Sequence, residues 1–326
     1  MIQGAPGAGK TALLDVLTTQ AKSNGWEVAE IAIEDLYTPA SMAQSLGEAY
    51  FLNSEFALKA GVTFIEGQVV GHVAGHATPQ KILKRLAPET GLILVLDEAQ
   101  RLYKIPDDSE RHTVASSTLE MIHNGKLGKP VILLTAGLGT SETAYGSLGI
   151  SRFVSKCRVP LGSLSYESTC DVIRDFLVDK GGVNPPPPKW IETIAGQTHG
   201  WSQHIVSYAD PAANYLASHQ TSTDKGLDIV LQQGRAEQIE YYERRAHDID
   251  EELRVTLTRA IKDVPIDGTT TRTVIIDGIK QSGLNEEDAD NLFTRALDQG
   301  IIDHQKRGRY GIPIPSFHTW LLDEYA

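Results

Sequence analysis

The chain carries a phosphate-binding signature close to its first residue. The octapeptide Gly4-Ala5-Pro6-Gly7-Ala8-Gly9-Lys10-Thr11 matches the pattern G-x-x-x-x-G-K-T. Its glycines let backbone N–H groups turn around the β- and γ-phosphates of a nucleotide, while the lysine adds a positive charge and the threonine offers a hydroxyl to Mg²⁺. A glycine-rich turn without a ligand explains four fixed positions in eight poorly. We therefore predict nucleotide contacts from Gly4, Pro6, Gly7, Ala8, Gly9, Lys10, Thr11 and Ala12, with Thr11 also a ligand of Mg²⁺.

Two carboxylates follow an apolar run in the middle of the chain. Leu92–Leu96 is apolar at every position, and Asp97 and Glu98 come directly after it. Such a strand is buried on both faces, and its C-terminal end is where an α/β sheet presents ligand groups. We assign Asp97 to the Mg²⁺ shell and Glu98 as the base that accepts a proton from the attacking water. Acids that merely begin a helix would give the same pair, but the phosphate loop favours the chemical role.

Two further residues are candidates for the same chemistry. Thr135 ends the next predicted buried strand, where its hydroxyl could bond the γ-phosphate or orient the water, although a threonine is common at such a place. Arg152 follows a glycine-rich turn, and its guanidinium could neutralise the γ-phosphate charge in a neighbouring subunit. From the residues alone, a surface arginine is equally good, and Arg158 is the lesser candidate.

Strand-like and helix-like segments alternate as far as residue 161, which predicts an α/β fold with a parallel, doubly wound sheet in a core over residues 1–161. The predicted strands are Glu27–Ile33, Leu92–Leu96, Val131–Thr135 and Arg158–Pro160, and the predicted helices lie near 11–23, 39–59, 79–87 and 112–125. Three residues precede the loop, fewer than the strand of about five that should feed it. We expect an incomplete first strand and a true start upstream. The glycine-rich segment 61–76 predicts a mobile hairpin or loop, and its glycines disfavour a helical metal pair formed by His72 and His76.

The remaining segments predict helical appendages. Helices at Tyr166–Lys180, Lys189–Gly196 and Gln203–Ser218 predict a small bundle over residues 162–222. A charged helix, Lys225–His247, predicts a solvated linker over 223–250. Residues 251–326 read as a winged helix-turn-helix, in which Ser282-Gly283-Leu284 makes the turn. Its elements are helices at Glu251–Lys262, Thr271–Gly278 and Glu286–Gln299, with strands at Ile301–His304 and Arg309–Pro313.

The composition limits the classes of partner. The net charge of the 326 residues is −12 and no apolar run of about 18 residues occurs, so we expect a cytoplasmic protein with no membrane span and two buried, unpaired cysteines. Residues 251–326 hold 13 acidic against 9 basic side chains. Acids that begin the helix at Glu286 would repel a DNA backbone, so a DNA contact is expected only from Lys306, Arg307 and Arg309. Docking of a protein partner is the other interpretation of this unit.

Together these motifs resemble the AAA+ superfamily of P-loop ATPases, nearest to the origin-recognition-type initiators and the related STAND signalling ATPases. The segments GAPGAGKT, LILVLDEAQ, VILLTAG and ISRF, and the helical lid, occur in that family's order. The resemblance covers essentially the whole chain. It implies that Lys10 and Thr11 form Walker A, Asp97 and Glu98 form Walker B, Thr135 is sensor 1 and Arg152 is the arginine finger.

The lid departs from the family pattern. Where many relatives have Gly-x-Pro-Arg, this chain has Gly200-Trp201-Ser202-Gln203-His204. The neutral Gln203 therefore stands in place of the sensor-2 arginine, which weakens the expected coupling between nucleotide and lid. Gln203 or His204 could still bond a phosphate, and we include Gln203 among the nucleotide-binding residues.

The resemblance implies an ATPase that uses ATP and Mg²⁺, forms a homo-oligomer and hydrolyses ATP at subunit interfaces. Its work would be to load on or remodel DNA or a DNA-associated complex. The alternative is a STAND-like, nucleotide-dependent regulatory switch whose winged-helix unit docks a protein partner. A small-molecule kinase fits less well, because no segment resembles an acceptor pocket.

Overall fold

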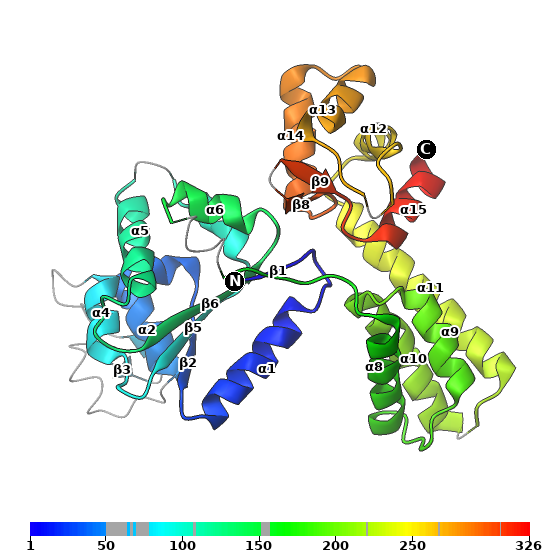
Figure 1. Cartoon of the computed structure of the whole chain (residues 1–326), viewed down its shortest axis with the longest axis horizontal. Helices are drawn as coiled ribbons and strands as arrows, with labels where there is room; N and C mark the ends of the chain where they lie inside the picture. Colours follow the sequence, from blue (N-terminus) through cyan, green and yellow to red (C-terminus); the bar gives the residue numbers. More distant parts are fainter. Residues whose placement is uncertain are drawn as a thin grey trace. The chain divides into compact units, whose positions relative to one another are not determined.

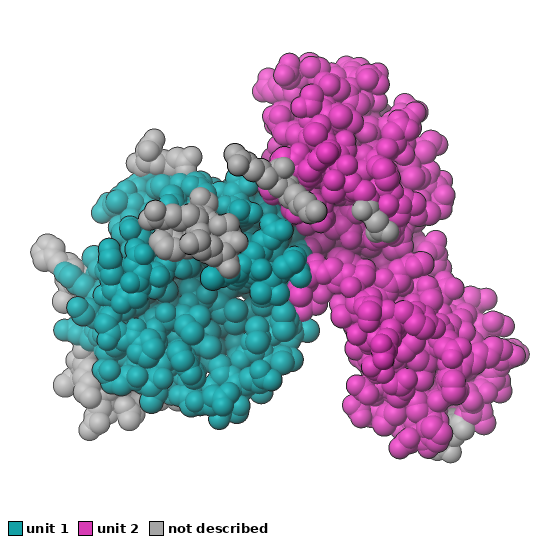
Figure 2. Space-filling view, in the orientation of Figure 1, with its two compact units in different colours: residues 1–4, 10–160 teal, residues 5–9, 161–326 magenta. Residues whose placement is uncertain are grey.

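The computed structural model describes residues 1–49, 64–65, 68–69, 78–106, 109–150, 157–219, 221–266, 268–306 and 308–326. The chain forms two compact units, coloured separately in Figure 2. The first comprises Met1–Gly4 and Lys10–Pro160, and the second comprises Ala5–Gly9 and Leu161–Ala326. The two ends of the phosphate loop therefore belong to the first unit, while its middle belongs to the second.

A five-stranded parallel sheet forms the centre of the first unit (Figure 1). Its order is β2 (Glu27–Glu30), β5 (Leu92–Leu96), β6 (Val131–Gly137), β1 (Ile2–Gln3) and β7 (Val159–Pro160). The predicted parallel sheet is confirmed. Strand β1 has two residues but is paired on both sides, since Ile2 lies opposite Ala136 of β6 and Val159 of β7.

Helices surround this sheet and build its core. They are α1 (Lys10–Ser23), η1 (Ile33–Leu36), α2 (Pro39–Ala49), α4 (Pro79–Leu86), η2 (Ala99–Lys104), α5 (Glu110–His123) and α6 (Ser141–Ser147). Side chains alternate along β5, so Leu92, Leu94 and Leu96 lie on one face, where they are buried in a core with residues of α2, α4 and α5. Strands β3 (Phe64–Ile65) and β4 (Gln68–Val69) pair antiparallel, as a hairpin requires. His72 and His76 lie outside the described residues.

The sequence defines several helix ends directly. Thr78 accepts a hydrogen bond from Lys81 N and precedes Pro79, which favours a helix start at α4. Ser109 accepts from His112 N in the same way at α5.

Strand β6 is longer and less buried than predicted. It continues to Gly137 beyond the predicted end at Thr135, and the Ile132 side chain is 49% exposed. Because side chains alternate, Ile132 lies on the face opposite the main core. The prediction of a fully buried strand is therefore wrong for its first half.

In its described residues the second unit consists mainly of helices, with one hairpin (Figure 1) and an isolated bridge between Thr270 and Tyr310. Helices α8 (Tyr166–Asp179), α9 (Pro188–Thr198), α10 (Ser202–His219) and part of α11 (Asp224–Ala246) share a core around Ile173, Trp190 and Tyr208. A further core joins the end of α11 to α12 (Glu251–Ile261), α13 (Arg272–Gln281), α14 (Glu286–Asp298) and α15 (Pro315–Tyr325). The hairpin consists of β8 (Asp303–Lys306) and β9 (Arg309–Gly311).

Three further predictions are corrected, two in the second unit and one on the cysteines. Ile301 and Ile302 are buried in the second core and precede β8 instead of beginning it. Helix α11 is not simply solvated, because Gln238, Tyr241, Tyr242 and Arg245 are buried where the helix contacts its neighbours. Cys157 is exposed beside the exposed strand β7 and Cys170 is half-buried, so the two free thiols are not buried ones.

No described helix is both long enough and apolar enough to cross a membrane. The division of residues 162–326 into lid, linker and winged helix stays a prediction.

Candidate nucleotide-binding site

The phosphate loop connects β1 to the start of α1. Gly7 (φ +78°) and Gly9 (φ +89°) have left-handed backbone conformations, which other residues rarely adopt. Gly4 N donates to Gly137 O at 3.1 Å, which fixes the start of the loop to the end of β6. Lys10 is buried and its Nζ donates to Gly4 O at 2.9 Å. The described geometry therefore brings a cation and a helix N-terminus to the end of the loop, the arrangement that favours a bound phosphate.

Thr11 and Asp97 lie together in the first unit. Thr11 Oγ1 donates to Asp97 Oδ2 at 3.2 Å, although the two residues are 86 positions apart. Strand β5 ends just before Asp97, and α1 begins just before Thr11. The Thr11 hydroxyl and the Asp97 carboxylate are hard oxygen donors. In nucleotide sites, Mg²⁺ takes one or two protein oxygens together with phosphate oxygens and water. This donor pair therefore fits a metal that a nucleotide also binds. The described residues contain no group of three or more acids, cysteines and histidines that could hold a metal.

Glu98 has an unusual backbone conformation. Its φ of 55° and ψ of 42° are left-handed, which is uncommon for a glutamate. The Glu98 N–H donates to Asp97 Oδ1 at 2.7 Å. Gln100 Nε2 donates to Glu98 Oε2, and Gln100 Oε1 accepts from Leu138 N at 3.1 Å. Gln100 thus links Glu98 to the end of β6.

Sequence reasoning missed Gln100. The sequence does place an amide side chain two residues after Glu98, the proposed base. An amide can donate to a carboxylate and accept from a backbone N–H at the same time, so this position could have suggested a bridge.

Thr135 is buried and lies opposite Leu96 in the sheet. Its hydroxyl makes a side-chain hydrogen bond with Tyr145 of α6, and burial raises the pKa of Tyr145, which stays protonated at neutral pH. Thr135 therefore lies beside β5, two residues before the end of β6. Its sensor role stays a prediction.

Arg152 and Arg158 are the two candidates for an arginine finger. Arg152 lies outside the described residues. Arg158 Nη1 lies 3.4 Å from Glu142 Oε2, which makes it part of an ion pair within the first unit. The arginine-finger assignment stays a prediction.

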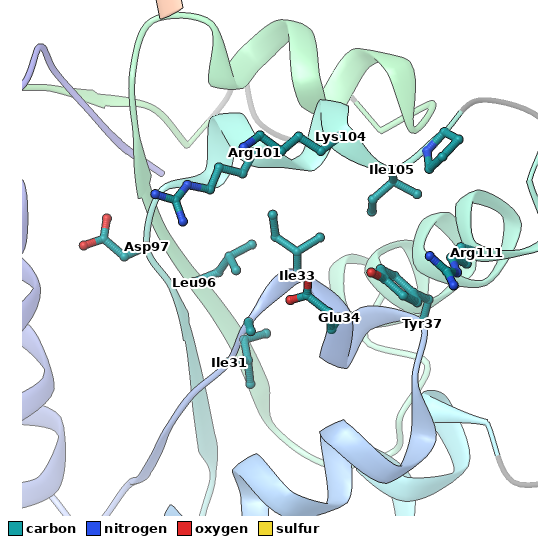
Figure 3. A pocket seen from close by; sticks show the side chains of 12 residues that line it. Ile31, Ile33, Glu34, Tyr37, Leu96, Asp97, Arg101, Lys104, Ile105 and Arg111 are labelled. Carbon is teal, nitrogen blue, oxygen red and sulfur yellow. The ribbon is translucent and has the colours of Figure 1, made fainter. Parts of the chain in front are cut away.

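Two cavities, each of about 310 Å³, adjoin at Asp97. One is lined by Thr11, Asp15, Glu98 and other residues around the Thr11–Asp97 pair. The other lies between η1 and η2 and is shown in Figure 3; its polar lining includes Glu34, Tyr37, Lys104 and Arg111. Arg101 lines both cavities and extends toward Asp97 in Figure 3. No sequence motif indicated that Arg101 would bring a positive charge beside the Thr11–Asp97 pair.

The start of helix α10 contacts the middle of the loop within the second unit. Gln203 N donates to Gly7 O at 3.0 Å, so its backbone contacts the loop. The participation of the Gln203 side chain in nucleotide binding stays a prediction. His204 is fully buried instead, with Nδ1 at 3.2 Å from Gln238 Nε2 and its ring against those of Tyr241 and Tyr242. Burial lowers the pKa of His204 to about 4, so the ring is neutral at physiological pH.

The C-terminal hairpin carries the basic residues predicted for DNA. Lys306 and Arg309 are paired in β8 and β9, and Arg309 is exposed, while Arg307 lies outside the described residues. The first turn of α14 exposes Glu286, Glu287 and Asp288. Asn285 caps this helix by accepting from Asp288 N at 2.9 Å, and the acids suit a helix N-terminus.

No protein-family model matches the sequence, and neither does any curated protein. Solved structures do match. The Walker-type ATPase PABY2304 of Pyrococcus abyssi superposes with a TM-score of 0.59 at 14% identity, over 98% of this chain and 89% of that one. The ORC2 protein of Aeropyrum pernix, solved as ADPNP–ADP complexes, superposes with a TM-score of 0.59 at 12% identity, over 99% of this chain and 85% of that one. At this identity the likeness establishes the fold, and the sequence-based resemblance is confirmed to that extent: the chain has the fold of the origin-recognition-type P-loop ATPases, a parallel-sheet core followed by helical domains.

Proposed function

We propose that this protein binds ATP with Mg²⁺ and hydrolyses it. The observation that carries the proposal is the hydrogen bond of 3.2 Å between Thr11 Oγ1 and Asp97 Oδ2, with Glu98 directly beside it. The loop, the helix N-terminus and the acidic strand end are the parts that phosphoryl transfer to water needs. Two proteins of the same fold are named as a Walker-type ATPase and as an ORC2 protein in complexes with ADPNP and ADP, which supports the same activity here.

The proposed mechanism assigns different tasks to these residues. Thr11 and Asp97 would hold Mg²⁺, which when bound neutralises charge on the β- and γ-phosphates. Lys10 and the loop N–H groups would bind the phosphate oxygens. Glu98 would orient the attacking water and accept its proton. The Arg101 cation lies on the metal side, and Thr135 is the sensor-1 candidate.

Replacement of Glu98 by glutamine tests this assignment. Glu98→Gln keeps the shape of the side chain but removes the base, so we expect ATP binding to persist while turnover falls at least about 100-fold. Glu34→Gln is the matched control, because Glu34 is an acid of the neighbouring cavity that does not adjoin Thr11. Lys10→Ala should lose binding. Normal turnover in Glu98→Gln would show that this residue is not the base.

We also propose that turnover depends on a neighbouring copy through Arg152. Specific activity should then rise with protein concentration, and Arg152→Ala should abolish that rise while leaving ATP binding intact. Equal activity of this variant and the wild type at high concentration would exclude the arginine finger.

The work done with ATP has two candidate forms. In the first, the protein loads on or remodels DNA or a DNA-associated complex, with phosphate contacts from Lys306, Arg307 and Arg309. In the second, the protein is a regulatory switch whose C-terminal unit docks a protein partner. The exposed acids at the start of α14 favour the second, because they would repel DNA.

A salt titration of DNA binding separates these forms. Binding to duplex DNA at about 50 mM salt that weakens steeply with added salt indicates phosphate contacts. Charge removal at Lys306 and Arg309 should then flatten the salt dependence. Absence of binding at low salt favours the switch.

A further inference from the structure

The start of helix α10 binds two backbone carbonyls of the phosphate loop. Gln203 N donates to Gly7 O at 3.0 Å, and Ser202 Oγ donates to Ala8 O at 3.3 Å. All these atoms belong to the second unit. The middle of the loop is therefore held from outside by groups that follow it by about two hundred residues.

Helix α11 binds the preceding carbonyl of the loop. Tyr241 Oη donates to Pro6 O at 2.7 Å, and Arg245 Nη1 donates to the same oxygen at 3.2 Å. Arg245 Nη1 also donates to Tyr241 Oη at 2.9 Å. Pro6 O thus accepts two hydrogen bonds from side chains one helical turn apart on α11.

The orientation of these carbonyls affects phosphate binding. A trans peptide is planar, so its C=O and N–H point in opposite directions. Tyr241 and Arg245 hold Pro6 O on the outside of the loop, so the Gly7 N–H points to the inside. Ser202 holds Ala8 O in the same way, so the Gly9 N–H also points to the inside. The Ala8 N–H donates to Ala5 O at 3.2 Å and stabilises the turn itself. Inward N–H groups are what a phosphate loop uses to bind its ligand.

The phosphate loop is closely packed at Gly7 and Pro6. A Cβ atom at Gly7 would lie 2.8 Å from Tyr241 Oη and 2.9 Å from Gln203 Cβ. At Gly300, in the turn after α14, a Cβ atom would lie 2.6 Å from Pro6 Cδ. The loop therefore packs tightly against α10, α11 and the turn after α14.

Arg245 connects these parts. It is 6% exposed, and its partners in the described part of the chain are oxygens without a formal charge. Nη2 donates to Gly300 O, and the guanidinium lies 5.2 Å from the centroid of the Phe317 ring. A buried cation costs free energy unless it is bonded, so Arg245 holds the loop carbonyl and the Gly300 turn together.

We propose that Tyr241 and Arg245 are positioning residues for nucleotide binding: they hold Pro6 O so that the loop N–H groups face the phosphates, and they couple the loop to the C-terminal helices through Gly300. This inference rests on the proposed nucleotide function. The residues belong to α11 and lie outside the motifs from which nucleotide contacts were predicted.

Neighbouring tyrosines supply a matched test. Tyr241→Phe removes the hydroxyl that bonds Pro6 O, whereas Tyr242→Phe removes one that bonds Ser316 Oγ at 2.8 Å. We expect the affinity for ADPNP, measured by calorimetry, to fall about 2- to 10-fold in Tyr241→Phe. It should change less than about 2-fold in Tyr242→Phe. Equal affinities in the two variants would overturn the proposal.

Two arginines supply a second test. Arg245→Gln removes the bridge, while Arg254→Gln removes an arginine that bonds Ala246 O at 3.0 Å and Ile249 O at 2.7 Å, neither of which belongs to the loop. We expect Arg245→Gln to weaken ADPNP binding at least about 10-fold, because a charged donor is lost. The single-turnover rate at saturating ATP should stay within about 3-fold of the wild type. Similar binding losses in both variants would indicate a merely structural role.

Hydrogen exchange separates this inference from the nucleotide function. In the protein without nucleotide, the amides of Gly7, Ala8 and Gly9 should exchange faster in Tyr241→Phe than in Tyr242→Phe. ADPNP should slow exchange near Gly300 in the wild type and not in Arg245→Gln. If the wild type bound no ADPNP, the proposed function would be refuted, but amide exchange in the loop would still test the role of Tyr241. If the loop amides exchanged equally fast in both tyrosine variants, that positioning role would be refuted.

Discussion

Asp97 and Glu98 are adjacent carboxylates with different partners. Asp97 accepts from Thr11 of α1, whereas Glu98 accepts from Gln100 of η2. The left-handed backbone at Glu98 is a conformation that costs roughly 1–3 kcal/mol and persists where surrounding contacts enforce it. The bond from Gln100, itself held by Leu138 N, is such a contact.

Replacement of Gln100 should therefore slow hydrolysis without affecting binding. In Gln100→Ala we expect ATP affinity within about 2-fold of the wild type and a single-turnover rate reduced about 10-fold, because the base is no longer oriented. The Leu138 N–H loses its acceptor, so the free energy of unfolding should also fall by about 1–3 kcal/mol.

Gln100→Glu separates the two effects. Its carboxylate still accepts from Leu138 N but cannot donate to Glu98 and repels that carboxylate. The variant should therefore be slow, and any loss of stability should come from charge repulsion and shrink with added salt. Gln80→Ala, in a glutamine that bonds Val114 O and Ser117 Oγ away from the site, is the control. An unchanged rate in Gln100→Ala would refute this role.

Several residues of the candidate site could be proposed from the sequence alone. The loop pattern and the acids after an apolar strand identify Lys10, Thr11, Asp97 and Glu98 because both signals are local. The partner of Thr135 was not predictable, since its hydroxyl bonds Tyr145 of a helix that follows β6. Such a contact depends on the packing of two elements, which no local pattern encodes.

At the scale of elements, α11 is a helix whose buried residues could not be predicted from the sequence pattern. Its charged residues predicted a solvated face, yet Gln238, Tyr241, Tyr242 and Arg245 are buried. The helix contacts α10 along one stretch and the C-terminal core along another, so no single apolar stripe runs its whole length. The helices and the parallel sheet were predictable from periodicity, whereas the contacts between α11 and the loop required the tertiary structure.

The contact between α10 and α11 should be sensitive to pH. Burial lowers the pKa of His204 to about 4, with Arg245 and Arg235 contributing, against about 6.5 in the unfolded chain. Between these values the unfolded chain binds the proton and the folded one does not, so stability is complete above about pH 6.5 and is lost as the pH falls toward 4. The loss amounts to about 3 kcal/mol.

Denaturant unfolding of the wild type and His204→Gln across this pH range measures the effect. The stability of the wild type should fall more steeply than that of the variant. His318 has a pKa lowered by burial and adds a change of the same sign in both proteins. Parallel curves would show that His204 is not responsible.

At the scale of the whole molecule, the residues proposed to contact nucleotide fall in the ranges of both compact units. Lys10, Thr11 and Asp97 belong to the first, and Ala5–Gly9 belong to the second. A ligand that binds folded residues of both units stabilises both by mass action.

Thermal unfolding should reveal this division. With ADPNP and Mg²⁺ at about 100 times the dissociation constant, ligand binding adds about 2.7 kcal/mol, and the unfolding of both units should shift upward. Lys10→Ala should abolish both shifts. A shift confined to one unit would mean that the nucleotide binds that unit alone.

The assignment of Ala5–Gly9 to the second unit also affects how the chain can be divided. Ala5 and Ala8 are buried in the core that contains Tyr242, Phe293 and Trp320. The polypeptide therefore passes between the units at three points: 4–5, 9–10 and 160–161. A break at 160–161 would leave five residues of the first fragment as an integral part of the second fold, so fragments 1–160 and 161–326 are complementary pieces and neither is a self-contained domain.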